Sequence, residues 1–196
     1  MPQPTLATSR LTLTPLTAAT AHLNLIIRLD TNPRVMKYIE KHVLTTQKAT
    51  DDHSVRLKAS LITDGLGYWV GYYENQPIGW WSLAPCTKDN GEVDPSKAEL
   101  GYRLLPQYWR QGLAKEGAGR LVRYGFEEMG LKEVFGQTMN VNEGSRKTME
   151  ACGMGFVRRF WEQFEDAIEG TEEGEVEYAI EKGEWEVLGE EKKGLV

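Results

Sequence analysis

A mostly apolar run, a turn broken by proline and a long amphipathic segment follow one another between residues 100 and 130. This order constrains the fold more than any other feature. Residues 100–105 predict a strand, which Pro106 ends. After the turn, apolar residues recur every three or four positions, as in a helix that buries one face, until Gly130 stops the pattern. The residues on that face are Leu113, Ala114, Gly117, Leu121, Val122, Phe126 and Met129.

The start of this predicted helix carries the residue types of an anion site. The first backbone N–H groups of a helix lack partners inside it, and Gly112 would let a pyrophosphate approach them closely. Arg110, Gln111 and Lys115 add two cations and an amide beside it. The alternative is that Gly112 only permits a tight turn. The segment lacks the Lys-Ser/Thr pair of a P-loop and the G-x-G-x-x-G of dinucleotide enzymes, which argues against both classes.

A second strand and a short helix follow this segment. Residues 134–139 are largely apolar and predict a strand next to the first one. Residues 145–152 predict a short helix, with Ser145 suited to its N-cap and Gly153 to its end. The connection between the two contains Asn142.

Together these segments resemble the GCN5-related N-acetyltransferase (GNAT) superfamily, and within it the RimJ/RimL-type branch. The first match is Tyr-Trp-Arg-Gln-Gly-Leu-Ala-Lys-Glu at residues 108–116. The second runs from Asn142 through Ser145 and Glu150 to Gly153-Met154. Residues 9–16 and 32–38 also resemble the first strand and the next helix start of that branch. The resemblance therefore covers most of the chain.

The resemblance implies an α/β (α+β) GNAT fold, in which a mixed, mostly antiparallel central sheet is splayed around acetyl-CoA and flanked by helices on both faces. It implies acetyl-CoA as the co-substrate and no metal. The pyrophosphate would lie on the helix start, and the pantetheine arm between the parted central strands. Lys147 would reach a phosphate, unless it is an ordinary surface cation. The residues expected to bind acetyl-CoA are Leu104, Arg110, Gln111, Gly112, Leu113, Ala114, Lys115, Asn142 and Lys147.

The chemistry of acetyl transfer then assigns two catalytic candidates. At pH 7 an α-amine with a pKa about 8 costs roughly 1.4 kcal/mol to deprotonate, and a lysine-like amine near 10.4 costs about 4.6 kcal/mol. Glu99 matches the place of the general base in some family members, although a strand glutamate is often only solvated. Ser145 would stand near the CoA sulfur as an acid or hydrogen-bond donor.

One departure from the family leaves the base open. Relatives of the branch carry a glutamate in the strand after the second motif, where this chain has Val157 or Arg159. Glu162, Glu165 or another glutamate within residues 162–175 is then the alternative base. Cys152 is a poor nucleophile candidate, because all three histidines of the chain lie far upstream.

The predicted function is acetyl-CoA-dependent N-acetyl transfer to a primary amine, by direct attack in a ternary complex. The acceptor is a small-molecule amine or a protein N-terminus, and the sequence does not choose between them. Two alternatives stay open: a non-catalytic acyl-CoA-binding module of the same fold, and transfer of a longer acyl group.

The remaining segments give the domain plan and the acceptor candidates. We expect a loose segment at 1–8, one domain at 9–187 and a charged tail at 188–196. Helices are expected at 18–29, from Pro33 and at 45–62, the last with Val55, Ala59 and Ile62 on one face. An aromatic hairpin at 67–83, a mobile loop at 84–96, strands at 156–164 and 176–181, and the end of a strand at 184–186 complete the plan. The acceptor would contact Met36, Tyr38, Trp80 and Trp81, unless these are plain core residues.

Composition excludes several classes of protein. The chain has 196 residues, a net charge of −6 and no basic tract, so nucleic acid is a poor partner. Two cysteines form no disulfide framework, and no apolar run has the length of a membrane span. We therefore expect a cytoplasmic or nuclear protein that is not secreted, acts without a membrane, and is a monomer or homodimer.

Overall fold

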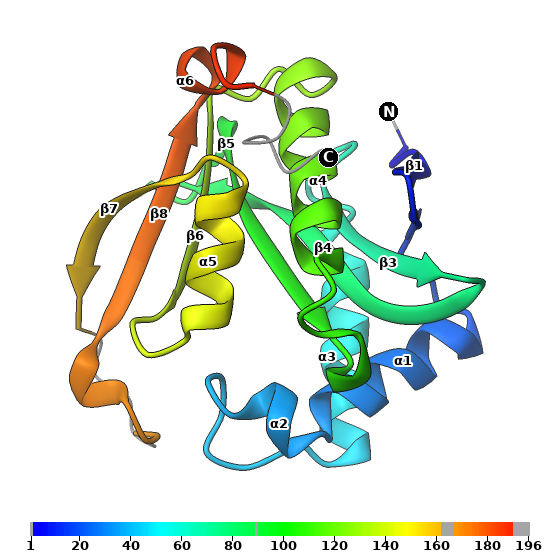
Figure 1. Cartoon of the computed structure of the whole chain (residues 1–196). Coiled ribbons are helices and arrows are strands. Elements are labelled where there is room, and N and C mark those ends of the chain that lie inside the picture. The colour runs from blue at the N-terminus through cyan, green and yellow to red at the C-terminus, as the bar shows by residue number, and fades with distance from the viewer. Residues whose placement is uncertain (1, 89, 162–166, 190–196) are drawn as a thin grey trace.

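The computed structural model describes residues 2–88, 90–161 and 167–189. One eight-stranded sheet, in the order β1-β2-β3-β4-β5-β6-β8-β7, forms its centre (Figure 1). Only β5 and β6 pair in parallel, because the crossover helix α4 joins them. The strands are β1 (Leu6–Ala7), β2 (Leu11–Pro15), β3 (Gly67–Tyr73), β4 (Gln76–Thr87), β5 (Val93–Leu104), β6 (Glu133–Met139), β7 (Gly155–Phe160) and β8 (Glu175–Glu181).

Helices cover the sheet on both faces. Helices α4 and α5 lie side by side on one face, and α1 and α3 pack on the other beneath β3 and β4 (Figure 1). This arrangement confirms the predicted mixed, mostly antiparallel sheet with helices on both sides. The helices are α1 (Thr20–Asp30), α2 (Pro33–Met36), α3 (Thr46–Ala59), α4 (Leu113–Glu127), α5 (Glu143–Ala151) and α6 (Lys182–Glu186), with 3-10 turns at Pro106–Tyr108 and Thr171–Glu173.

The sheet opens between its two central strands. Strands β5 and β6 pair only where Lys97, Ala98 and Glu99 lie beside Glu133, Val134 and Phe135. Beyond Glu99, β5 continues to Leu104 and β6 to Met139, but no further residues of the two strands pair in the described structure. The prediction that these strands part is confirmed, and the opening leaves one side of the β5 backbone available for a ligand.

Alternation along β3 and β4 divides the apolar side chains between two cores. Trp69 and Trp81 join the larger core beneath α4, together with Phe126. Val70 and Trp80 join the smaller one beneath α1. The aromatic hairpin is thus explained by a sheet that is buried on both faces.

Several predicted elements were wrong in extent. Residues 84–96 are mostly strand, because β4 and β5 pair as far as Thr87 and Val93, so the predicted loop is too long. Residues 184–186 lie in helix α6, which a capping box between Glu181 and Glu184 starts. The segment 1–8 contains strand β1, whose buried Leu6 pairs with Leu13. Strand β7 ends at Phe160. Residues 162–164 of the predicted strand lie outside the described residues.

Helix α3 packs through the opposite face from the one predicted. Val55 is 62% exposed and Ile62 59% exposed, whereas Ala49, His53 and Arg56 are buried. Polar side chains can face inward here because each has a partner: His53 Nε2 lies 3.1 Å from the Thr17 carbonyl oxygen. Apolar spacing alone therefore chose the wrong face.

Candidate active site

The turn before α4 has the geometry of an anion-binding helix start. Gly112 is the N-cap residue, with φ +77° in the left-handed region and no side-chain cap. The first intrahelical bond of the turn runs from the Glu116 N–H to the Gly112 carbonyl oxygen at 3.0 Å. The N–H groups of Leu113, Ala114 and Lys115 precede it and have no partner inside the helix. A pyrophosphate fits here, because Gly112 adds no side chain and the helix dipole favours negative charge.

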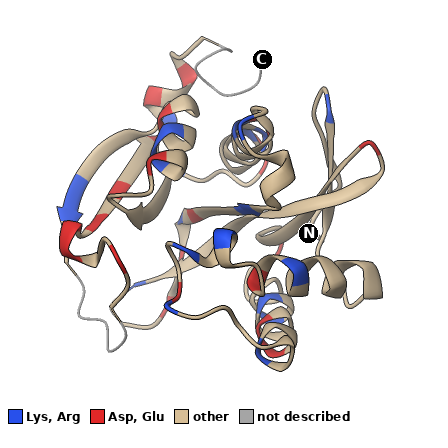
Figure 2. Ribbon diagram, turned by 60° about the horizontal axis from the view of Figure 1, so that its bottom comes forward, with Lys and Arg blue, Asp and Glu red and all other residues tan. Residues whose placement is uncertain are grey.

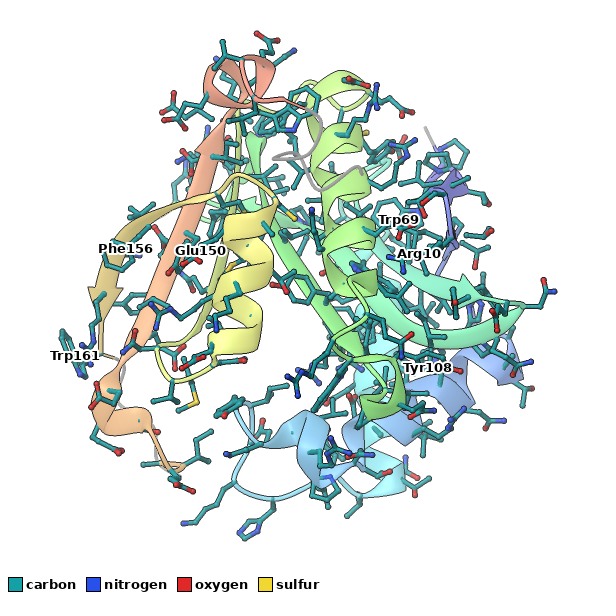
Figure 3. All side chains as sticks on the ribbon, viewed as in Figure 1. Arg10, Trp69, Tyr108, Glu150, Phe156 and Trp161 are labelled. Carbon is teal, nitrogen blue, oxygen red and sulfur yellow. The ribbon has the colours of Figure 1, made fainter. Side chains whose placement is uncertain are left out.

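An arginine from the N-terminal strands braces this turn. Arg10 donates from Nη1 to the Gln111 carbonyl oxygen at 3.0 Å and from Nε to Glu116 Oε2 at 2.6 Å. Figure 3 shows Arg10 between the N-terminal strands and α4. Its Nη2 is the only described atom within 4 Å of the position that a Gly112 Cβ would take. Sequence reasoning matched Arg10 to the family but assigned it no role in the site.

Glu116 anchors this arrangement from inside the helix. It is buried and also accepts hydrogen bonds from Thr8 and Ser9. Burial alone would raise the pKa of Glu116, but the hydrogen bonds from Thr8 and Arg10 outweigh burial and hold the pKa below its usual value. Glu116 therefore stays charged and fixes Arg10 beside the turn.

The structure distinguishes among the residues predicted for the acetyl-CoA loop. Arg110 and Gln111 are exposed, and Lys115 is half-buried. The Gln111 amide donates to the Gln107 carbonyl oxygen at 2.8 Å, so it stabilises the turn. The carbonyl oxygen of Leu104 accepts from Trp109 Nε1 at 2.7 Å. This leaves the backbone of residues 100–103 as the part of β5 better suited to pair with a pantetheine arm.

The residues predicted on the second motif are mostly engaged within the protein. Asn142, not Ser145, is the N-cap of α5: its Oδ1 accepts from the Ser145 N–H at 3.3 Å. The predicted cap was wrong because the helix begins two residues earlier, at Glu143. Lys147 is exposed and pairs with Glu143 at 3.0 Å, on the outer side of the helix. Arg146 turns inward and donates to the Asn140 carbonyl oxygen at 2.9 Å.

A tyrosine that sequence reasoning missed spans the opening of the sheet. The Tyr102 hydroxyl donates to the Ser145 carbonyl oxygen at 3.0 Å and lies 3.2 Å from Ser145 Oγ. Burial raises the pKa of Tyr102, so the hydroxyl keeps its proton. Strand alternation offered a signal, because Tyr102 shares the α4-facing side of β5 with Leu100 and Leu104.

Glu99 lies at the point where β5 and β6 separate. It is exposed to solvent and projects from the sheet face opposite α4, since its neighbours Ala98 and Leu100 are buried in the core beneath that helix. The protein atoms around the carboxylate still remove enough water to raise its pKa, and the negative charge of Glu177 raises it further. A carboxylate with a raised pKa is a stronger base toward an incoming ammonium group.

The acceptor candidates lie at different depths. Trp81 is fully buried and donates from Nε1 to the Ala114 carbonyl oxygen at 3.1 Å, so its predicted place in an acceptor pocket was wrong. Trp80 lies on the other face of the sheet, close to Arg56 and Arg103. Met36 is buried there too, whereas Tyr38 is half-buried beneath Lys37.

The geometry argues against cysteine chemistry. Cys152 is fully buried, its Sγ lies 3.6 Å from the Lys115 carbonyl oxygen, and burial raises its pKa to about 12. A thiol in that state is a poor nucleophile. The alternative bases Glu162 and Glu165 lie outside the described residues. Across residues 2–88, 90–161 and 167–189, no group of three His, Cys, Asp or Glu side chains is placed to hold a metal ion.

Charge and helix length add two observations on partners. Lys and Arg residues alternate with Asp and Glu residues along the ribbon of the helices (Figure 2). In the described part of the chain, no helix is both long and apolar enough to cross a bilayer.

Comparison with protein families and curated proteins gives consistent matches. The family model of the acetyltransferase (GNAT) domain matches residues 10–155. FsC-acetyl coenzyme A-N(2)-transacetylase from Aspergillus fumigatus is 41% identical over 186 residues, which cover 93% of this chain and 78% of that protein.

Solved structures share the fold at lower identity. Spermidine N-acetyltransferase from Vibrio cholerae, solved with CoA and spermine, is 18% identical with a TM-score of 0.70 and covers 91% of this chain and 99% of its own. RimL, the ribosomal L7/L12 alpha-N-protein acetyltransferase solved with coenzyme A, is 12% identical with a TM-score of 0.72 and covers 91% and 98%. These two likenesses show the fold alone, so the RimJ/RimL branch stays a prediction.

Proposed function

This chain belongs to the GNAT acetyltransferase family and is an acetyl-CoA-dependent N-acetyltransferase, and from this premise we propose that it acetylates the primary amine of a small molecule by direct attack in a ternary complex. One observation carries the proposal. The parallel pairing of β5 and β6 ends at Glu99, and from that point the free side of β5 runs toward the Gly112 turn. A base, a path for pantetheine and a pyrophosphate site thus lie along one strand and the turn that follows it.

The chain's own residues hold the co-substrate by its phosphates and its arm. The N–H groups of Leu113, Ala114 and Lys115 would bind the pyrophosphate, with Arg10 and Arg110 adding positive charge. The backbone of residues 100–103 would pair with the pantetheine amides. Bound acetyl-CoA supplies an activated thioester carbonyl, which the opening of the sheet presents to the acceptor.

Glu99 receives the proton of the acceptor. An amine attacks only in its neutral form, so the ammonium group must lose a proton on or before attack. The raised pKa of Glu99 suits an acceptor near pKa 8, which costs roughly 1.4 kcal/mol to deprotonate at pH 7, better than a lysine-like amine at about 4.6 kcal/mol.

Tyr102 and Ser145 act on the other side of the thioester carbon. As the C–S bond breaks, the sulfur gains negative charge and needs a donor. The Tyr102 hydroxyl and Ser145 Oγ, 3.2 Å apart, form a pair that can donate a hydrogen bond to the sulfur, and CoA leaves as a thiolate that takes its proton from water. Cys152 stays outside this chemistry because it is sealed in the core.

Two observations support a particular class of acceptor. The name of the A. fumigatus relative gives a nitrogen, N(2), as the group that it acetylates. Among amines, the demand on the base favours an α-amine, because an α-amine is the easier amine to deprotonate. We therefore favour the α-amine of a small amino-acid-derived molecule over a polyamine or a lysine side chain.

The test is CoA release with acetyl-CoA against a panel of small α-amines, polyamines, aminoglycosides and short peptides. Release that is largest with small α-amines, with one acetyl group found on the amine by mass spectrometry, supports the proposal. Release confined to polyamines or peptides would contradict the proposed acceptor class. Faster release with a longer acyl-CoA than with acetyl-CoA would show that the transferred group is a longer acyl chain.

A further inference from the structure

A buried cluster of charged residues lies beside the proposed acceptor position. Asp30 is fully buried and accepts from Arg56 Nη1 at 2.8 Å and from Arg103 Nη1 at 2.9 Å. The two arginines carry two positive charges and Asp30 carries one negative charge, so one positive charge is left uncompensated. An uncompensated charge in a largely buried place is costly unless it meets an anion.

Trp80 completes this cluster by packing against both arginines. The guanidinium carbons of Arg56 and Arg103 lie 5.5 Å and 5.3 Å from the Trp80 ring centroid. Trp80 is only 6% exposed, and its Nε1 has no hydrogen-bond partner among the described residues. This Nε1 is also sealed from solvent, so Trp80 supports the two arginines through the face of its ring and does not itself reach a ligand.

Arg103 has N–H donors that bind no other group in the described part of the protein. Only its Nη1 has protein partners in the described structure, namely Asp30 and the sulfur of Met36. Its Nε and Nη2 have no hydrogen-bond partner among the described residues, and 19% of its side chain is exposed. Arg56 is more deeply buried than Arg103, with 10% of its side chain exposed against 19%.

Strand geometry places Arg103 and Glu99 on the same face of β5. Residues 99, 101 and 103 alternate with the buried residues 98, 100 and 104 of the α4 side. Gly101 lies between the two, and Ser82 Oγ and the Trp80 ring lie over its backbone, 2.7 Å and 3.4 Å from the position that a Gly101 Cβ would take. The Cα atoms of Glu99 and Arg103 are about 13 Å apart by the rise of a strand.

We propose that Arg103 binds a negatively charged oxygen group of the acceptor while Glu99 receives its amine. This inference rests on the proposed function and deepens it by naming the substrate class: a zwitterionic amine, with a carboxylate or another anionic oxygen group several atoms from the amine. The same positive charge repels polyamines. Arg103 is thus a specificity-determining residue, and Asp30 positions it.

The role of the anionic group can be tested with two amines that differ only in that group. Glutamic acid α-amide and glutamine α-amide have the same size and the same type of α-amine, but only the first carries a side-chain carboxylate. Calorimetry on the protein saturated with CoA measures the binding of each and does not depend on turnover. We expect about tenfold tighter binding of the carboxylate form, the usual size of one charge-assisted hydrogen bond.

The variant Arg103→Gln should bind both amines equally, and Arg103→Lys should keep part of the preference. Arg56→Gln is the matched control: it also removes one partner of Asp30, so it lowers the melting temperature, yet it should keep the preference. Every variant must still bind acetyl-CoA. Equal binding by the wild type, or a preference that survives in Arg103→Gln, overturns the inference. Failure of the proposed function is a separate result, because it shows as absent CoA release with every amine.

Discussion

The Tyr102 hydroxyl lies 3.0 Å from the Ser145 carbonyl oxygen and 3.2 Å from Ser145 Oγ, which connects β5 to α5 across the opening of the sheet. Because β5 and β6 no longer pair at this level, the hydrogen bonds of Tyr102 join the two halves of the structure where the thioester would lie. The contact is therefore both structural and close to the proposed chemistry.

Tyr102→Phe removes only the hydroxyl. If Tyr102 and Ser145 donate to the sulfur, kcat should fall by about 10- to 100-fold while the KM for acetyl-CoA changes little. Tyr124→Phe is the control, because Tyr124 is a buried tyrosine whose hydroxyl bonds to the Gly65 carbonyl oxygen at 2.9 Å, away from the opening. Equal losses of kcat in the two variants would show that Tyr102 matters only for stability.

Gly112→Trp should abolish acetyl-CoA binding, because the new side chain fills the space above the first turn of α4. The matched control is Gly130→Trp. Gly130 also has a positive φ, +70°, and no described atom lies within 4 Å of the position of its Cβ. Both substitutions cost about 1–2 kcal/mol of backbone strain. Acetyl-CoA should raise the melting temperature of Gly130→Trp but not that of Gly112→Trp. Similar rises in the two variants would contradict the placement of the pyrophosphate at the Gly112 turn.

Arg10→Met should weaken acetyl-CoA binding several-fold and lower stability by about 1 kcal/mol, because the Gln111 carbonyl oxygen and Glu116 both lose a donor. Arg10→Lys keeps a charge near Glu116 but cannot bond both groups at once, so it should restore stability more than affinity. Urea unfolding and calorimetry give the two quantities. Unchanged affinity in Arg10→Met would confine Arg10 to a structural role.

Glu99→Gln should lower kcat/KM by about 100-fold or more at neutral pH. The loss should shrink at high pH, where the amine deprotonates without help. Glu177→Gln removes the negative charge that raises the pKa of Glu99, so the acid limb of the pH–rate profile should move to lower pH. Glu173→Gln is the control, since Glu173 pairs with Arg159. A loss in Glu99→Gln that does not depend on pH would contradict the base assignment.

Two buried histidines predict how stability depends on pH. Burial lowers the pKa of His22 and, chiefly through the same cause, that of His53. The unfolded chain therefore takes up protons below about pH 6.5 that the folded protein resists, and stability falls as the pH drops through that value. His22→Gln should flatten the decline in the urea midpoint between pH 7.5 and 5.5. An unchanged decline would assign the loss to other groups.

The features that sequence predicted well are those with local causes. The helix start at Gly112 could be predicted because a glycine before an amphipathic segment is a local pattern, and the strands on either side follow from apolar runs. The larger core followed from the spacing of residues such as Leu121 and Phe126, which repeats with the period of a helix.

The features that sequence missed depend on residues far apart in the chain. Asp30, Arg56 and Arg103 meet only in the folded structure, and their pairing puts polar residues on the inner face of α3, against the apolar pattern. The Arg10–Glu116 pair spans 106 positions. The role of Trp81 was misjudged for a similar reason, because its depth is set by α4, which crosses above it.

The most direct test of the central claim is an initial-rate study in which acetyl-CoA and the best amine of the panel are varied together. Direct transfer in a ternary complex predicts intersecting lines in the double-reciprocal plot, acetylated amine equal in amount to the CoA released, and no acetyl group left on the protein. Parallel lines with an acetylated protein would contradict direct attack, and CoA release without acetylated amine would contradict the transfer itself.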